Sequence, residues 1–181
     1  MRNLSKNILG LCLVGMGLGV GAPTQAATGV GPYYAMPSWD QTLPAATRFI
    51  VLTNMNSEAV LDRETGLVWE LSPSGSSVNW KDATFHCIDT AKGGRKGWRL
   101  PTLQEIMSLI DPTQSTPALP SGHPFRGVIV GAGYWSATTL VSDAILAWSV
   151  VFNAGDAVPL PKNDPFVFTW CVRGGQGPDT Q

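Results

Sequence analysis

The side chains of this sequence best suited to bind a metal or to act as nucleophiles are those of two histidines and three cysteines. His86 stands beside Cys87, and His123 lies in a proline-rich stretch. A zinc or iron site needs three or more ligands drawn from His, Cys and carboxylates. Neither histidine has a carboxylate or a second histidine at a ligand spacing. The sequence therefore predicts no metal and no cofactor.

Nucleophilic catalysis would need a free thiol or an activated hydroxyl next to a base. Once the N-terminal segment with Cys12 is set aside, Cys87 and Cys171 remain. In an exported protein such a pair is more often bridged than free. Ser136 has no recognisable His and Asp support in the sequence. We therefore expect no catalytic residue and a protein that is not an enzyme.

A basic cluster follows these residues in the chain. Lys92, Arg95 and Lys96 could meet sulfate or carboxylate groups, because arginine forks make paired hydrogen bonds to such anions. The alternative is a solvated turn whose cations lie near a helix C-terminus, where the helix dipole favours them. Arg99, which follows Trp98, is expected to be structural and to lie beside a carboxylate or backbone carbonyls.

The sequence is rich in tryptophan, with seven among 181 residues, and these side chains could serve either a core or a ligand surface. Exposed Trp and Tyr stack well on sugar rings. The surrounding alternation is typical of a core at Trp69, Trp80, Trp98, Trp148 and Trp170. Tyr134 and Trp135 lie at a loop–strand junction. They are the better candidates for partial exposure and ligand binding, with a core position as the alternative.

The N-terminus has the features of a secretory signal peptide over residues 1–26. Arg2 and Lys6 precede an uncharged run, and Thr24-Gln25-Ala26 offers small residues to a signal peptidase. The run is Gly-rich and shorter than the roughly 20 residues that a membrane span needs. We expect cleavage after Ala26, no span in the mature chain, and a periplasmic, extracellular or cell-surface location.

Charge argues against nucleic acid as a partner. Without Arg2 and Lys6, ten Lys and Arg stand against 13 Asp and Glu, so the mature chain has a formal net charge of about −3. Such a chain has no bulk positive field to hold an anionic polymer.

The elements that would position these residues begin after an irregular arm over residues 27–47. Residues 49–52 read as a strand. Residues 60–62 and 67–70 flank a turn that contains Gly66 and therefore predict a hairpin.

Two helices are expected next. Asn79 can cap the first, which ends at Gly93-Gly94 and has Cys87 on its buried face. Pro101 precedes the second, over residues 103–110. There the Thr102 hydroxyl can accept from the Glu105 N–H while the Glu105 carboxylate accepts from the Thr102 N–H.

A long connection without an obvious element covers residues 111–133. A connection of more than about 15 residues is usually functional or mobile. Strands are predicted at 134–138, 147–152 and 166–173, which completes a domain over residues 48–175. A polar tail, 176–181, follows.

Several ordered motifs over roughly residues 48–175 resemble the Lcl C-terminal family of bacterial exported domains. They are Thr65-Gly66-Leu67-Val68-Trp69-Glu70, Trp80-Lys81-Asp82-Ala83 with Cys87, Gly97-Trp98-Arg99-Leu100-Pro101-Thr102 with Glu105, Tyr134-Trp135-Ser136-Ala137-Thr138, Ala147-Trp148, and Cys171-Val172-Arg173. The second half of that family resembles in turn the C-type-lectin-like fold, which lectins share with the formylglycine-generating enzymes.

The resemblance implies an α+β, C-type-lectin-like fold with small antiparallel sheets, two helices, a long loop region and one disulfide, Cys87 to Cys171. Ligand contacts would then come from residues 111–133 and 140–145. The best-studied members are surface adhesion modules that bind sulfated polysaccharides as trimers. Motif residues expected to be structural are Trp69, Trp98, Arg99, Pro101, Thr102, Glu105, Trp148 and Arg173.

Two activities of related proteins are not carried over. The calcium-binding motifs of true lectins are missing, and Asp111 and Asp143 are too sparse to supply six or more oxygens. The formylglycine-generating enzymes need additional cysteines. We therefore predict a non-catalytic exported binding module for a glycan or a surface protein. The alternatives are a structural subunit of a cell-surface or periplasmic assembly, including a homo-oligomer, and an enzyme of the formylglycine-generating group.

Overall fold

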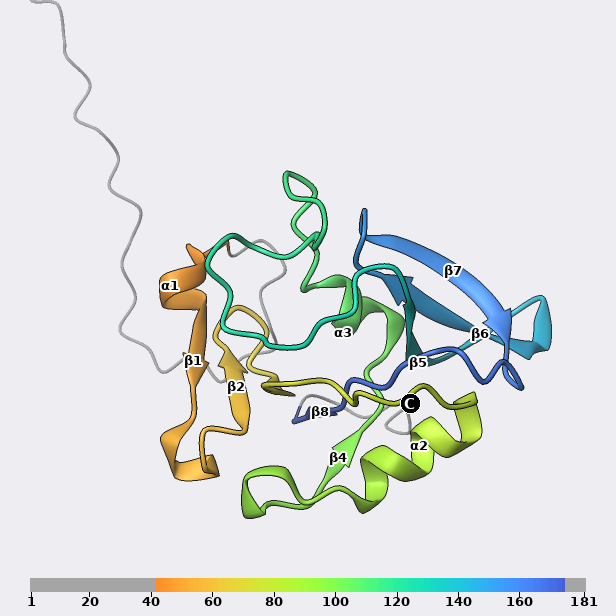
Figure 1. The fold of residues 1–181 in the computed structure, drawn as a ribbon, viewed down its shortest axis with the longest axis horizontal. Coiled ribbons are helices and arrows are strands. Elements are labelled where there is room, and N and C mark those ends of the chain that lie inside the picture. Colours follow the sequence, from red (N-terminus) through yellow and green to blue (C-terminus); the bar gives the residue numbers. More distant parts are fainter. Residues whose placement is uncertain (1–41, 175–181) are drawn as a thin grey trace, which may run out of the picture. The chain divides into compact units, whose positions relative to one another are not determined.

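A computed structural model describes residues 42–174, which form an α+β domain (Figure 1). The expected signal peptide, the arm before Thr42 and the polar tail lie outside these residues. Within the described arm, Ala45–Arg48 forms a helical turn, α1, where the sequence predicted irregular chain. No helix among residues 42–174 combines the length and apolarity needed to cross a membrane.

The first sheet of the described domain is five-stranded and entirely antiparallel, in the order β1-β2-β3-β8-β4. Its strands are β1 (Phe49–Val51), β2 (Ala59–Asp62), β3 (Val68–Glu70), β8 (Val172–Arg173) and β4 (Trp98–Arg99). Gly66, with a φ of 70°, lies in the predicted hairpin turn between β2 and β3. The last strand of the domain therefore lies between β3 and β4.

The second sheet of the described residues is three-stranded, in the order β5-β6-β7. Its strands are β5 (Gly133–Leu140), β6 (Asp143–Val151) and β7 (Asp156–Pro161). The sequence predicted the first two and missed β7, which contains Pro159 and Pro161. Proline cannot donate to a ladder, but β7 is an edge strand, where this is tolerated.

Two helices are capped as their sequences predict. α2 (Trp80–Asp89) begins where the Asn79 side chain accepts from the Asp82 N–H. α3 (Leu103–Met107) begins with the complete Thr102–Glu105 capping box. α3 is shorter than the predicted 103–110, because the chain tightens into bonds between residues three apart, such as Ile110 N to Met107 O at 3.0 Å. Two short 3-10 turns, η1 (Thr53–Met55) and η2 (Lys92–Gly94), complete the regular elements of residues 42–174.

One disulfide ties α2 to the chain entering β8. Cys87 and Cys171 are joined, with their Cα atoms 5.5 Å apart, and both are fully buried. This pairing was expected, but the strand around Cys171 is not as predicted. Residues 166–171 pass from one sheet to the other and make only isolated bridges, Val167 to Val78 and Phe168 to Tyr134.

Aromatic side chains fill the main core between the two sheets. Trp170 packs edge-on against Trp69 and Phe125, with ring centroids 5.8 and 4.9 Å apart, and it also contacts Tyr134 and Phe152. All five lie in one buried cluster. Burial of rings of this size dominates the stability of a small core. The core prediction therefore holds for Trp69 and Trp170.

Candidate functional site

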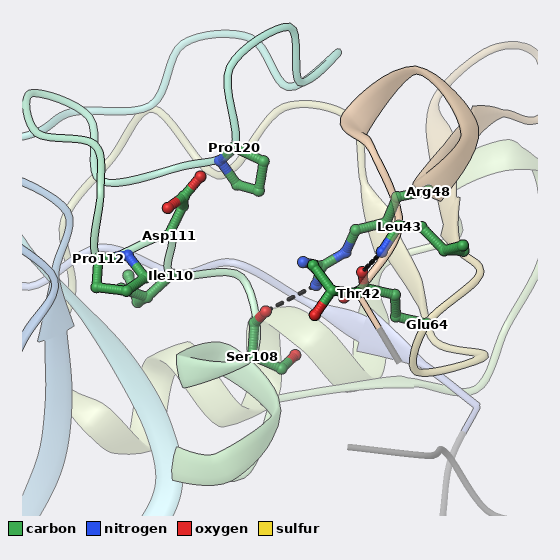
Figure 2. A pocket seen from close by; sticks show the side chains of 9 residues that line it. All are labelled: Thr42, Leu43, Arg48, Glu64, Ser108, Ile110, Asp111, Pro112 and Pro120. Atoms are coloured by element: carbon green, nitrogen blue, oxygen red, sulfur yellow. Dashed lines mark hydrogen bonds and ion pairs between the residues drawn. The ribbon is translucent and has the colours of Figure 1, made fainter. Parts of the chain in front are cut away.

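The long loop after α3 borders a cavity of about 270 Å³, shown in Figure 2. One side of the cavity comes from the start of the described chain and the β2–β3 turn, and the other from residues 108–120. Its lining consists of Thr42, Leu43, Arg48, Glu64, Ser108, Ile110, Asp111, Pro112 and Pro120. The cavity thus lies at the first part of the loop region that the sequence singles out for ligand contacts.

Arg48 lies in one wall of this cavity, where four oxygen atoms surround its guanidinium. Its Nε and Nη2 donate to the two carboxylate oxygens of Asp62 at 3.0 and 2.8 Å. Nη1 lies 2.8 Å from Glu64 Oε2, and Nη2 also donates to the Ser108 carbonyl at 2.7 Å. The guanidinium therefore joins β2, the β2–β3 turn and the end of α3, and both carboxylates are committed to it.

Glu64 and Asp111 place acceptor oxygens on opposite sides of the cavity (Figure 2). Glu64 also accepts from the Leu43 N–H. Asp111 accepts from the Thr113 hydroxyl at 2.6 Å and from the Thr113 N–H at 2.9 Å. These two bonds hold the pKa of the half-buried Asp111 carboxyl below its usual range, so it is ionised at neutral pH.

The chemistry of this wall suits neutral polar ligands better than anions. Arg48 is the cation of the lining, and its donors are already engaged by Asp62, Glu64 and Ser108. A sulfate would meet two carboxylates and no unengaged guanidinium. A ligand that donates hydroxyl or N–H groups would instead find carboxylate and hydroxyl oxygens as acceptors.

The expectation that Tyr134 and Trp135 are partly exposed is wrong. Both are fully buried at the start of β5. The Tyr134 hydroxyl accepts from the Ile129 N–H at 2.7 Å, and burial raises the pKa of this phenol. Trp135 Nε1 donates to the Val78 carbonyl at 2.9 Å. Because their polar ends are engaged inside the fold, these side chains do not offer a surface for stacking on sugar rings.

The three basic residues proposed for anion binding, Lys92, Arg95 and Lys96, lie in and just after η2, outside the lining of the cavity. Arg95 is exposed, and the Lys96 ammonium donates to the Asp89 carbonyl at the end of α2, at 2.6 Å. This geometry is that of cations near a helix C-terminus. Their role in ligand binding stays a prediction.

Arg99 lies beside a carboxylate, where its position after Trp98 led us to expect it. Its two terminal nitrogens each lie 2.7 Å from an oxygen of Glu105. Trp98 is buried, and its Nε1 donates to the Arg95 carbonyl at 3.0 Å. Arg173 donates from Nε to the Lys96 carbonyl at 2.8 Å, which fixes β8 to the basic turn.

The remaining motif residues make contacts within the fold. The buried Pro101 accepts from the Ala137 N–H at 2.7 Å. Trp148 is half-buried on β6, and its carbonyl accepts from the Ser136 hydroxyl at 2.9 Å. Ser136 therefore acts as the strand residue that the sequence suggested. Trp80 is half-buried rather than core, with the Lys162 ammonium 4.4 Å from its ring centre.

The two histidines have different surroundings. His123 stacks on Phe125, and burial lowers its pKa. His86 is exposed on α2, and the fold brings it a carboxylate that sequence spacing did not reveal. One ligand atom each from His86, Glu70 and Cys171 lies within 4.8 Å of the others. Because the Cys171 sulfur is in the disulfide, this group has no thiolate ligand.

Sequence reasoning missed Arg48, Glu64 and Ser108 as site residues. They come from three separate segments, and no motif links them. The available signal was weak. It consisted of an arginine directly before a predicted strand and a glutamate in a predicted hairpin turn.

These features define a disulfide-tied α+β domain with a loop-bordered polar cavity. The chain belongs to the Lcl C-terminal domain family, whose sequence profile matches residues 58–173. The matched region includes both cysteines of the disulfide and the capping box of α3. A comparison with curated proteins gives no match.

Proposed function

We propose that this chain is a non-catalytic exported binding module that recognises a glycan or a surface protein through the loops after α3. The observation that carries the proposal is the cavity beside Asp111. It lies where the loop region meets the first sheet, and it is lined by oxygen acceptors, with Arg48 bonded across to the Ser108 carbonyl. Binding sites of this kind combine a concave shape with a few placed polar groups.

We further propose that the fold is of the C-type-lectin-like kind. What supports this is the disulfide from the first long helix to the chain entering the last strand. A second support is the irregular segment of more than 20 residues between α3 and β5, which has the position of a ligand-binding loop region.

The favoured ligand class is a neutral glycan. Its hydroxyl groups would donate to the Asp111 carboxylate and to other oxygens of the cavity. A sulfated glycan fits the cavity less well, because Arg48 is engaged by its own carboxylates. Sulfated ligands would require the exposed cations near Arg95 instead.

The test is a glycan array probed with the wild-type chain and two matched variants. Asp111→Ala removes a carboxylate from the cavity, and Asp156→Ala removes an exposed carboxylate at the start of β7, outside its lining. We expect wild type and Asp156→Ala to be retained alike, and Asp111→Ala to bind at least about tenfold more weakly, which is about 1.4 kcal/mol. Absence of retention on any glycan, with turnover of a substrate instead, would overturn the proposal.

A second candidate function, a subunit of a surface assembly, is favoured by a different region. Another cavity, of about 470 Å³, lies at the end of the second sheet and is lined by Ala144, Ile145, Pro161, Lys162 and Asn163. Nearby large apolar side chains are exposed, among them Ile145 at 68% and Phe166 at 76%. Such surfaces favour protein partners. Mass measurement in solution separates the candidates, because an assembly subunit would give an oligomer that Ile145→Asp dissociates.

Export is part of the same proposal. The chain would be cleaved after Ala26 and found outside the cytoplasm. Intact-mass measurement on the exported product tests this, and we expect a chain beginning at Ala27. A product that keeps Met1 in the cytoplasm would contradict it.

A further inference from the structure

The fold gathers metal-ligating groups from three distant segments around the disulfide. An oxygen of Glu70 at the end of β3, a ring nitrogen of His86 on α2 and Sγ of Cys171 before β8 all lie within 4.8 Å of one another. Glu70 and Cys171 are buried, whereas His86 is exposed. The group therefore has a protein-lined side and a side that an ion could enter from solvent.

Cys87 completes this group, since its sulfur is bonded to that of Cys171. We propose that reduction of this disulfide creates a zinc site whose ligands are Cys87, Cys171, Glu70 and His86. Two thiolates, one imidazole and one carboxylate are a ligand set that four-coordinate Zn²⁺ accepts. The inference concerns the reduced chain and does not depend on the proposed binding function.

The required movement is small. Zinc bonds of 2.0–2.3 Å place the ligand atoms of a tetrahedral site about 3.3–3.8 Å apart. The three ligand atoms are already within 4.8 Å of one another, so a contraction of at most about 1.0–1.5 Å brings them to an ion. Rotation of side chains supplies such a shift once the two sulfurs separate from their bonded distance.

The surroundings orient the ligands in advance. Glu70 is 1% exposed, and its Oε2 accepts from the Cys171 N–H at 3.0 Å, so the carboxylate is held beside the sulfur. His86 and Cys87 are fixed by the backbone of α2. Lys92 is close enough to act on the Glu70 charge, and it would offset part of the negative charge of two thiolates and a carboxylate.

A phosphine can reduce the Cys87–Cys171 disulfide. The phosphine takes an oxygen atom from water and becomes a phosphine oxide, while the S–S bond breaks and each sulfur gains a proton. The disulfide accepts two electrons in this step. Binding of Zn²⁺ then releases both thiol protons to solvent as two zinc–sulfur bonds form.

The experiment uses the untagged full chain with Cys12→Ser, so that no other thiol or added histidine contributes. After reduction with a water-soluble phosphine, the chain is titrated with Co²⁺, which reports tetrahedral thiolate coordination by its visible and near-ultraviolet absorption. We expect a single equivalent to bind, Zn²⁺ to displace it, and the oxidised chain to show no such spectrum. Near-ultraviolet circular dichroism follows the fold throughout.

Three variants decide which residues hold the ion. His86→Ala and Glu70→Gln are expected to weaken Co²⁺ binding by roughly 10- to 100-fold or more, whereas His123→Ala, which removes the histidine outside the group, binds like the parent. Equal binding by all three variants would overturn the proposal. So would a reduced, folded chain without the spectrum, or a reduced chain that unfolds and is not restored by Zn²⁺.

Discussion

The Arg99 guanidinium and the Glu105 carboxylate meet in a two-point ion pair, with both N–O distances 2.7 Å. The same Glu105 carboxylate accepts from the Thr102 N–H at 2.8 Å and so closes the capping box of α3. Arg99 also donates to the Gly174 carbonyl at 2.7 Å. One carboxylate therefore starts a helix and, through Arg99, links β4 to the end of the described chain.

Removing this carboxylate should destabilise the domain. We expect Glu105→Ala to lower the free energy of unfolding by about 2–3 kcal/mol, because a half-buried arginine loses its partner and the helix loses half of its capping box. Thr102→Ala should cost about 1 kcal/mol. Urea denaturation measures both, with Gln104→Ala, an exposed change on the same helix, as the control. A Glu105→Ala cost no larger than that of the control would contradict this role.

Arg48 should contribute more than Arg63 to the free energy of unfolding, although both residues lie near the same hairpin. Arg48→Met leaves the fully buried Asp62 carboxylate without its cation, and breaking a buried pair from one side costs about 3–5 kcal/mol. Arg63 is exposed and donates only to the Thr47 carbonyl, so Arg63→Met should change stability by about 0.5 kcal/mol or less. Equal midpoints for the two variants in urea would show that the Arg48 network does not stabilise the fold.

Glu70 should make the folded state less stable as pH rises. Burial raises its pKa from 4.5 to about 7, so between these values the folded chain binds more protons than the unfolded chain. The contribution of Glu70 to the free energy of unfolding should therefore be largest below about pH 4.5. It should decrease as the pH rises through 7, by an amount on the order of 3 kcal/mol.

The matched variant for this effect is Glu70→Gln, which keeps the shape and an acceptor for the Cys171 N–H. Its stability relative to wild type should increase from pH 4.5 to pH 8, as followed by urea denaturation at each pH. A difference between the two chains that does not vary with pH would contradict the raised pKa.

The disulfide should stabilise the domain by restricting the unfolded chain. Its cysteines are 84 residues apart, and closing a loop of that length corresponds to roughly 4–5 kcal/mol in the chain-entropy treatment. We expect the double variant Cys87→Ala, Cys171→Ala to unfold at a correspondingly lower urea concentration. Mass spectrometry of unreduced chain treated with an alkylating reagent provides the check, because a labelled Cys171 would mean that the bond is not formed.

The sequence predicted those parts of the fold that depend on hydrogen bonds between residues close together in the chain. Asn79 and Thr102 cap helices because their side chains reach backbone N–H groups three residues on, which sequence spacing reveals. The β2–β3 hairpin depends in the same way on Gly66 in its turn. β7 was hidden because Pro159 and Pro161 read as breakers, and only its edge position makes them acceptable.

Contacts between residues far apart in the chain could not be predicted from the sequence. The apolar run 166–171 has strand composition, yet it divides its backbone bonds between both sheets, for example Phe168 N to Gly133 O at 2.8 Å and Glu70 N to Cys171 O at 3.1 Å. Tyr134 and Trp135 were expected at a partly exposed junction, but both are buried, and both contact the crossing chain, Tyr134 through the Trp170 ring and Trp135 through a backbone bond to Phe168 O at 3.0 Å. The lining of the cavity likewise combines residues 42–64 with residues 108–120, which no local pattern connects.

The measurement that tests the proposed recognition site most directly is hydrogen exchange, read by mass spectrometry, with and without the strongest glycan from the array. We expect the glycan to slow exchange in peptides covering residues 108–120 and the β2–β3 turn, and Asp111→Ala to abolish this protection. Protection confined to residues 141–145 and 162–166, or none at all with the glycan bound, would contradict it.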